Sequence, residues 1–67
     1  MNFIEAMNYV ANGGKAYLKD WDVKRNYIYM DKDTKEFREF FYDVDMLFTV
    51  YVGELLEYIN GTWEVVE

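Results

Sequence analysis

The chain must build its hydrophobic core from 67 residues without a disulfide, because it contains no cysteine. A domain of this size buries only about 60% of the surface that its unfolded chain exposes, so its stability is marginal. Histidine is absent as well, which makes a structural zinc site very unfavourable. We therefore expect a single domain over residues 1–67 that depends on dense packing or on a partner chain, without metal or cofactor.

Aromatic side chains supply much of the apolar surface: seven tyrosines, five phenylalanines and two tryptophans. Such side chains bury large areas and dominate both cores and interfaces. Because so small a domain has little interior, we expect part of this aromatic surface to lie between the subunits of a homo-oligomer. A dimer or a tetramer is the simplest arrangement.

The net charge of −6 is concentrated in the second part of the chain. Residues 1–30 carry four bases against three acids, whereas residues 31–67 carry three bases against ten acids. A nucleic-acid backbone repels this balance, so we expect no direct binding to DNA or RNA. A partner protein with a basic groove would be attracted, although acidic residues also keep an aromatic-rich protein soluble.

The hydropathy pattern predicts a cytoplasmic protein without membrane contact. No apolar run approaches the roughly 20 residues that cross a bilayer. The N-terminus also lacks the basic region followed by an apolar stretch that is typical of a signal peptide.

The first segment predicts a helix that ends at the pair Gly13–Gly14. Asn2 and Glu5 have the spacing of a capping box, in which each side chain pairs with a backbone N–H of the first turn. A glycine after the last turn adopts the left-handed conformation at little cost. The apolar side chains on one stripe of this helix are Phe3, Met7 and Val10.

Alternating and β-branched patterns predict that the rest of the chain is mainly strands. The expected strands cover residues 15–20, 27–30, 36–44, 45–52 and 62–66, with a polar connection at 22–26 and a turn at 31–34. A helix is the alternative for residues 36–44. Gly53 is expected to end the strand over residues 45–52.

Residues 54–59 fit either a short helix or a strand that pairs with the last one across Asn60–Gly61. Their good helix formers favour the helix. The fold class is therefore α+β, an N-terminal helix packed on an antiparallel sheet of four or five strands, with a short second helix near the C-terminus as the favoured interpretation.

Four short motifs are shared with a known protein family. The first consists of Phe3, Ala6, Met7, Val10 and Gly13, and the second of Trp21, Lys24 and Tyr27. The others are VDM at 44–46 and WEVV at 63–66. With these motifs the chain resembles the Thoeris anti-defence group of cyclic-nucleotide sponges, which phages and prophages encode. Asp22 and Val23 depart from the family pattern, which has asparagine and glycine there.

The resemblance implies a small α+β oligomer that sequesters a signalling nucleotide at a subunit interface and catalyses nothing. The ligand-binding residues would then be Trp21, Asp22, Lys24, Arg25 and Asp45. Trp21 would stack on a base, and the two basic residues would bind phosphate. Asp45 would accept hydrogen bonds from a ribose or a base edge. Without a ligand, the same residues would be a core or interface tryptophan, solvated charges and a turn residue.

A second function is open, that of an acidic protein-binding inhibitor that imitates a nucleic acid and blocks a host nucleic-acid or defence enzyme. Its acidic surface would consist of Glu36, Glu39, Asp43, Asp45, Glu54, Glu57, Glu64 and Glu67. A structural oligomer is a third interpretation. We do not expect an enzyme, because the absence of serine, cysteine and histidine leaves ordinary nucleophilic and acid–base sites nearly empty, and the aspartates Asp20, Asp22, Asp43 and Asp45 are a weak basis for a paired-carboxylate enzyme.

Overall fold

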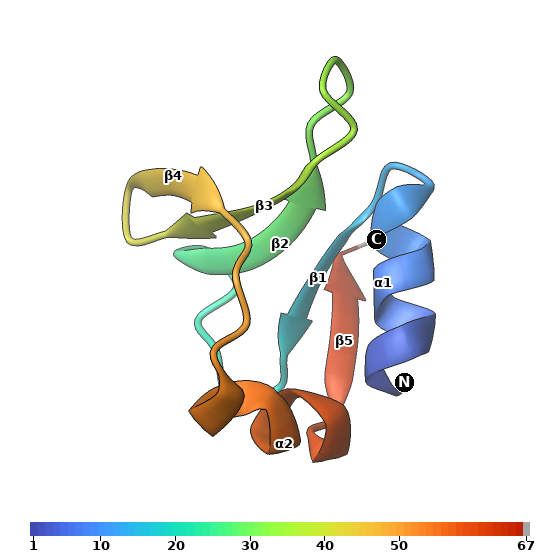
Figure 1. Cartoon of the computed structure of the whole chain (residues 1–67), viewed down its shortest axis with the longest axis vertical. Helices are drawn as coiled ribbons and strands as arrows, with labels where there is room; N and C mark the ends of the chain where they lie inside the picture. Colours follow the sequence, from blue (N-terminus) through green and yellow to red (C-terminus); the bar gives the residue numbers. More distant parts are fainter. Residues whose placement is uncertain (67) are drawn as a thin grey trace.

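The structure, a computed structural model that describes residues 1–66, contains two helices and a five-stranded sheet (Figure 1). In chain order the elements are α1 (Phe3–Ala11), β1 (Lys15–Leu18), β2 (Asn26–Met30), β3 (Phe37–Phe41), β4 (Val44–Leu47), α2 (Val52–Asn60) and β5 (Trp63–Val66). The strand order is β4-β3-β2-β1-β5, and each neighbouring pair is antiparallel. The α+β class predicted from the sequence is confirmed, and residues 54–59 are helical.

The predicted start and end of α1 are confirmed. The N–H of Glu5 donates to Asn2 Oδ1 at 2.8 Å, and the N–H of Asn2 donates to Glu5 Oε1 at 3.0 Å, which completes the capping box. After the last turn, Gly13 has a φ of 103°, the left-handed conformation that glycine adopts without steric cost. Ala6 and Val10 are fully buried against the sheet.

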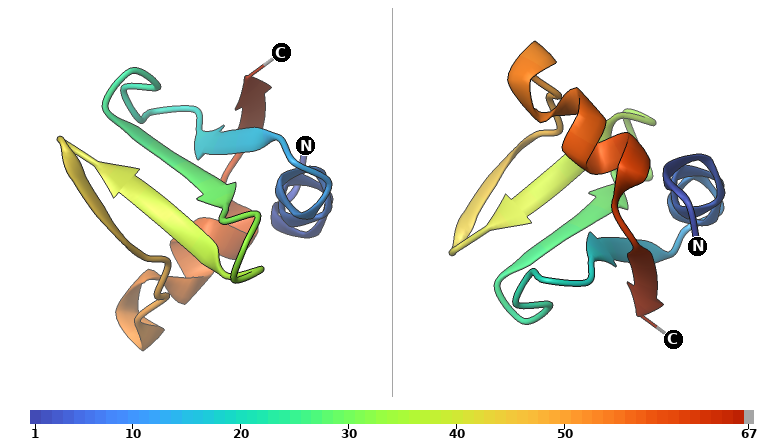
Figure 2. Two further views of the ribbon diagram at one scale, coloured as in Figure 1. Left: turned by 90° about the horizontal axis from the view of Figure 1, so that it is seen from above. Right: turned by 90° about the horizontal axis from the view of Figure 1, so that it is seen from below.

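Both helices cover the same face of the sheet, and the core lies between the helices and this face (Figure 2). The buried apolar side chains are Ala6, Val10, Ala16, Leu18, Ile28, Tyr58 and Trp63. Trp63 is the centre of this core: its Nε1 donates to the backbone oxygen of Tyr58 at 2.8 Å. The ring of Trp63 also lies 5.5 Å from that of Phe3 and 5.6 Å from that of Trp21, between centroids. One aromatic cluster therefore joins β5 to both helices and to the β1–β2 connection.

The opposite, outer face of the sheet carries half-buried aromatic side chains, and two of their hydroxyls, those of Tyr17 and Tyr29, donate to carboxylates. Tyr27 and Phe40 lie opposite each other on β2 and β3, with ring centroids 5.3 Å apart. The Tyr29 hydroxyl donates to Asp45 Oδ1 at 2.7 Å, and Arg38 Nε donates to the same oxygen at 3.3 Å. Acids and bases occur together on this face, unlike on the helices.

The predicted strand over residues 36–44 is wrong in its extent, because the chain reverses inside it. Phe41 and Val44 pair directly across a two-residue turn formed by Tyr42 and Asp43. These two residues have φ values of 46° and 71°, as in the mirror-image turns that match the twist of a hairpin. Such turns usually contain Asn-Gly or Asp-Gly, so the sequence Tyr-Asp did not indicate one.

The predicted strand over residues 45–52 is also too long. β4 ends at Leu47, and α2 begins at Val52 and includes Gly53. Phe48 and Val50 pack against the core instead of continuing the edge of the sheet. Gly53 does not end an element here, because the first turn of a helix needs no intrahelical N–H partners and tolerates weak helix formers.

Candidate functional site

An open cavity of about 380 Å³ lies between α2 and the β3–β4 part of the sheet, on the helix-covered face. We call it the Glu39 cavity. The side chains that define its chemistry are Trp21 from the β1–β2 connection, Asn26, Glu39 and Phe41 from the sheet, and Glu54 and Tyr58 from α2. A volume of this size accommodates a small organic group.

The strand register places the carboxylate of Glu39 on the core face. Glu39 lies opposite the fully buried Ile28 on β2 and opposite Met46 on β4. Because alternate residues of a strand share a face, Phe37 and Phe41 belong to the same side. The alternation of Phe37, Glu39 and Phe41 along one strand therefore indicated that the Glu39 carboxylate shares a face with two aromatic side chains. The sequence interpretation missed it and assigned Glu39 to an exposed acidic surface.

Two carboxylates and a phenol meet in the Glu39 cavity. Burial raises the pKa of Glu39, and the nearby charge of Glu54 raises it further. The Tyr58 hydroxyl donates to Glu54 Oε2 at 3.2 Å. Burial and the two carboxylates also raise the pKa of Tyr58 far above its ordinary value, so this phenol stays a neutral donor. The cavity thus combines negative charge with a partly desolvated wall.

Asn26, which also lines the cavity, has a side-chain oxygen that accepts no hydrogen bond within the described part of the chain. Its side chain is only 6% exposed, and its Oδ1 has no hydrogen-bond partner among the described residues. Buried polar atoms are normally paired, since leaving one unpaired costs about 1–3 kcal/mol. Asn26 therefore adds, to the residues that line the cavity, a buried oxygen without a donor among the described residues.

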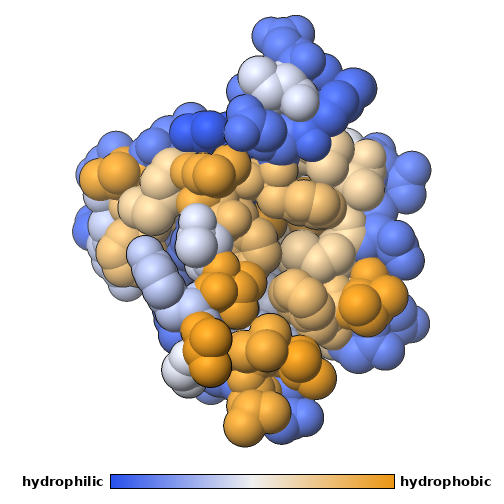
Figure 3. Space-filling model, viewed as in Figure 1, coloured by the Kyte–Doolittle hydropathy of each residue, from blue (hydrophilic) through white to orange (hydrophobic). Residues whose placement is uncertain are grey.

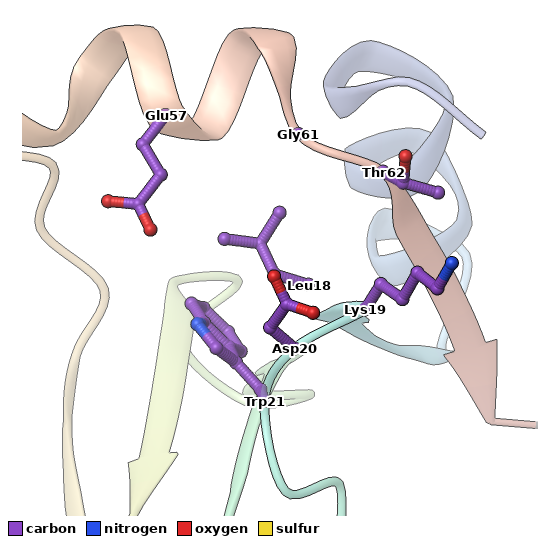
Figure 4. A pocket seen from close by; sticks show the side chains of 7 residues that line it. All are labelled: Leu18, Lys19, Asp20, Trp21, Glu57, Gly61 and Thr62. Carbon is purple, nitrogen blue, oxygen red and sulfur yellow. The ribbon is translucent and has the colours of Figure 1, made fainter.

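A smaller cavity of about 140 Å³ shares Trp21 with the Glu39 cavity. Glu57 reaches toward it from α2, and Asp20 and Trp21 reach toward it from the end of β1 (Figure 4). Lys19 points toward β5 and away from Glu57 (Figure 4). This second cavity is therefore also bordered by carboxylates next to the tryptophan.

The structure separates the residues that were predicted to bind a ligand. Trp21 is half-buried and lines both cavities. Asp22 Oδ1 accepts the N–H of Lys24 at 3.1 Å within the turn before β2. Lys24 and Arg25 are exposed and, among the described side chains, neither lines one of the two cavities. Asp45 lies on the outer face of the sheet, opposite to the face on which Trp21 packs.

The acidic residues that were expected to form one surface are distributed over both faces. Asp45 and Glu64 lie on the outer face, where they accept hydrogen bonds from Tyr29 and Tyr17. Glu39 lines the cavity, whereas the acidic residues of α2 are Glu54 and Glu57. Glu67, which was also assigned to this surface, lies outside the described residues.

Comparisons with protein-family models, with curated proteins and with solved structures find no match for this chain. Within residues 1–66, no group of three or more histidine, cysteine, aspartate or glutamate side chains could hold a metal ion. The helices in this part of the chain are too short and too polar to cross a membrane.

Proposed function

We propose that this protein is a non-catalytic inhibitor that holds a partner protein against its two helices. The observation that carries the proposal is a set of exposed apolar side chains, which we call the helical apolar surface. It consists of Ile4, Tyr51, Val52, Leu55, Leu56 and Ile59. Val52 is 91% exposed and Leu56 is 70% exposed, and apolar atoms gather over α2 in Figure 3. Exposed apolar surface of this kind is typical of interaction sites.

An apolar hollow of about 380 Å³ connects the two helices within this surface. It is lined by Asn2, Phe3, Ile4 and Ile59, from the start of α1 and the end of α2. Binding energy at interfaces concentrates where a protruding side chain fills such a pocket. The hollow is therefore the expected position of an apolar anchor of the partner.

The charges of the helices favour a basic partner. α1 and α2 contain no lysine or arginine, and their charged residues are Glu5, Glu54 and Glu57. Two copies that paired through these helices would bring like charges together, whereas a partner with basic and apolar residues would be complementary. This supports the protein-binding interpretation of the acidic chain.

Sequestration of a nucleotide receives less support from the geometry. Both cavities beside Trp21 are bordered by carboxylates, which repel phosphate groups. Lys24 and Arg25 are exposed and line neither of these cavities. The nucleotide-binding function and the homo-oligomer remain predictions from the sequence.

The proposal is tested with two amphipathic peptides of equal length, one of leucine and lysine and one of leucine and glutamate, by isothermal titration calorimetry. We expect binding of the basic peptide only, with an affinity that falls as salt is added. The substitution Leu56→Asp, at an exposed position, should weaken this binding about tenfold or more, because it puts a charge into the apolar contact.

The matched control is Val44→Asp, which adds the same charge at an exposed position of the β3–β4 hairpin. It should bind the basic peptide nearly as well as the wild type does. Equal affinity of Leu56→Asp and Val44→Asp would show that the helical apolar surface is not the binding site.

A further inference from the structure

We propose that the Glu39 cavity is a binding site for an N–H-donating organic cation, an alkylammonium or alkylguanidinium group. This site goes beyond the proposed partner binding, because it lies between α2 and the sheet and not on the exposed side of the helices. The same chemistry occurs in a free amine and in a basic side chain of another protein.

The first argument is the number of acceptors on the residues that line the cavity. Asn26 Oδ1 is buried and has no partner within the described part of the chain. The carboxylates of Glu39 and Glu54 line the same space. Among these acceptors, a described side chain satisfies only Glu54, through the Tyr58 hydroxyl. An ammonium or guanidinium group would supply the missing donors.

The second argument is charge. The described residues that line the cavity include two carboxylates and no lysine or arginine. A partly buried carboxylate without a cation is unfavourable, and an opposite charge a few ångströms away relieves this cost. Arg38, a neighbour of Glu39 in sequence, projects from the outer face and pairs with Asp45. A compensating positive charge would therefore come from a ligand and not from a side chain that lines the cavity.

The third argument is the shape of the walls. Trp21, Phe41 and Tyr58 provide aromatic surface around the carboxylates. Aromatic faces attract cations, and they also cover the alkyl part of an amine. A metal ion fits less well, because the described residues contain no group of three acidic or imidazole ligands. The combination of aromatic walls with two carboxylates selects an organic cation.

The test uses butylammonium and butylguanidinium as probes, with amide chemical shifts of the full chain as the readout. We expect saturable shifts centred on Asn26, Glu39 and Glu54. Butyltrimethylammonium has the same charge but no N–H, and should bind about tenfold more weakly. Butanoate should not bind. Equal shifts with all three cations, or with butanoate, would overturn the proposal.

Two variants locate the site. Glu39→Gln keeps the shape of the side chain and should weaken butylammonium binding about tenfold. Its control is Glu36→Gln, which removes the same charge from an exposed position just before β3. Asn26→Leu should also weaken binding while the chain stays folded. Indistinguishable affinities of Glu39→Gln and Glu36→Gln would contradict the assignment.

Two further measurements identify the source of the cation and distinguish this proposal from the proposed partner binding. A short peptide with one arginine, compared with free butylguanidinium, distinguishes a protein side chain from a free small cation as the better ligand, and its citrulline counterpart is the uncharged control, which should not bind. Leu56→Asp, which removes the partner surface, should leave butylammonium binding unchanged. Loss of amine binding in Leu56→Asp would instead place the amine on the exposed side of α2 and overturn the cavity assignment.

Discussion

At the scale of single residues, Glu39 is the least expected feature of the fold. A carboxylate stands on the core face of β3, opposite the fully buried Ile28. The titratable groups that face it come from α2, namely Glu54 and Tyr58. None of them is a base, so ionisation of Glu39 is costly in the folded chain.

This residue makes stability depend on pH in a direction opposite to that of most acids. Burial and Glu54 raise the pKa of Glu39 above its value in the unfolded chain. Between the two pKa values the folded state binds more protons, so the free energy of unfolding falls as the pH rises. We expect Glu39→Gln to gain stability relative to the wild type across this window, and the difference to be constant below and above it.

Urea midpoints measured over a series of pH values check this prediction, with Glu36→Gln as the control for the loss of one charge from an acidic protein. A difference between Glu39→Gln and wild type that is the same at acid and neutral pH would mean that Glu39 ionises as freely in the folded chain as in the unfolded one.

At the scale of elements, the β3–β4 hairpin depends on a costly turn. Tyr42 and Asp43 both have positive φ, a conformation that costs a residue with a Cβ about 1–2 kcal/mol relative to glycine. The Tyr42 ring packs on Phe41 with centroids 4.8 Å apart, and the Tyr42 N–H donates to the Arg25 oxygen at 2.7 Å. These contacts offset part of the cost.

Asp43→Gly should therefore stabilise the chain by about 1 kcal/mol, because glycine adopts this φ without strain. Asp43→Asn is the matched control, since it removes the same charge but keeps a Cβ. Chemical denaturation of both variants isolates the backbone effect. If the two variants have equal midpoints, the turn is not strained at Asp43.

At the scale of the whole molecule, one aromatic cluster connects elements that are distant in sequence. Trp63 contacts Phe3 of α1, Tyr58 of α2 and Trp21 of the β1–β2 connection through its ring. A domain of this size has only a few kcal/mol of net stability to lose. Its cooperativity therefore depends on this cluster, whether or not copies of the chain associate as predicted from its aromatic content.

Trp63→Ala should remove about 3–5 kcal/mol, as large-to-small changes in a core do, and leave the chain mostly unfolded at room temperature. Circular dichroism and amide shift dispersion check this. Leu47→Ala, at a position that is 50% exposed, should remain folded. A folded Trp63→Ala chain with sharp thermal unfolding would show that the cluster is not essential.

The candidate site was only partly predictable. Trp21 drew attention because so large a side chain next to charged residues is informative by itself, and it lines both cavities; its predicted role as a stacking residue stays a prediction. Asn26 was not assigned to a site, and Glu39 and Glu54 were assigned to an exposed acidic surface, since the convergence of the three residues depends on the strand register and on the position of α2. Neither of these is encoded within a short stretch of sequence.

Local patterns determined α1 and the presence of several strand-forming segments, and they favoured a helix over a strand for residues 54–59. Capping, alternation and helix propensity act over a few residues and can be read directly. The tertiary structure decided where β3 turns, why the chain leaves the sheet after Leu47, and which acids are buried. These features depend on contacts between distant segments, because the packing of Phe48, Tyr58 and Trp63 outweighs the local preferences of the residues between them.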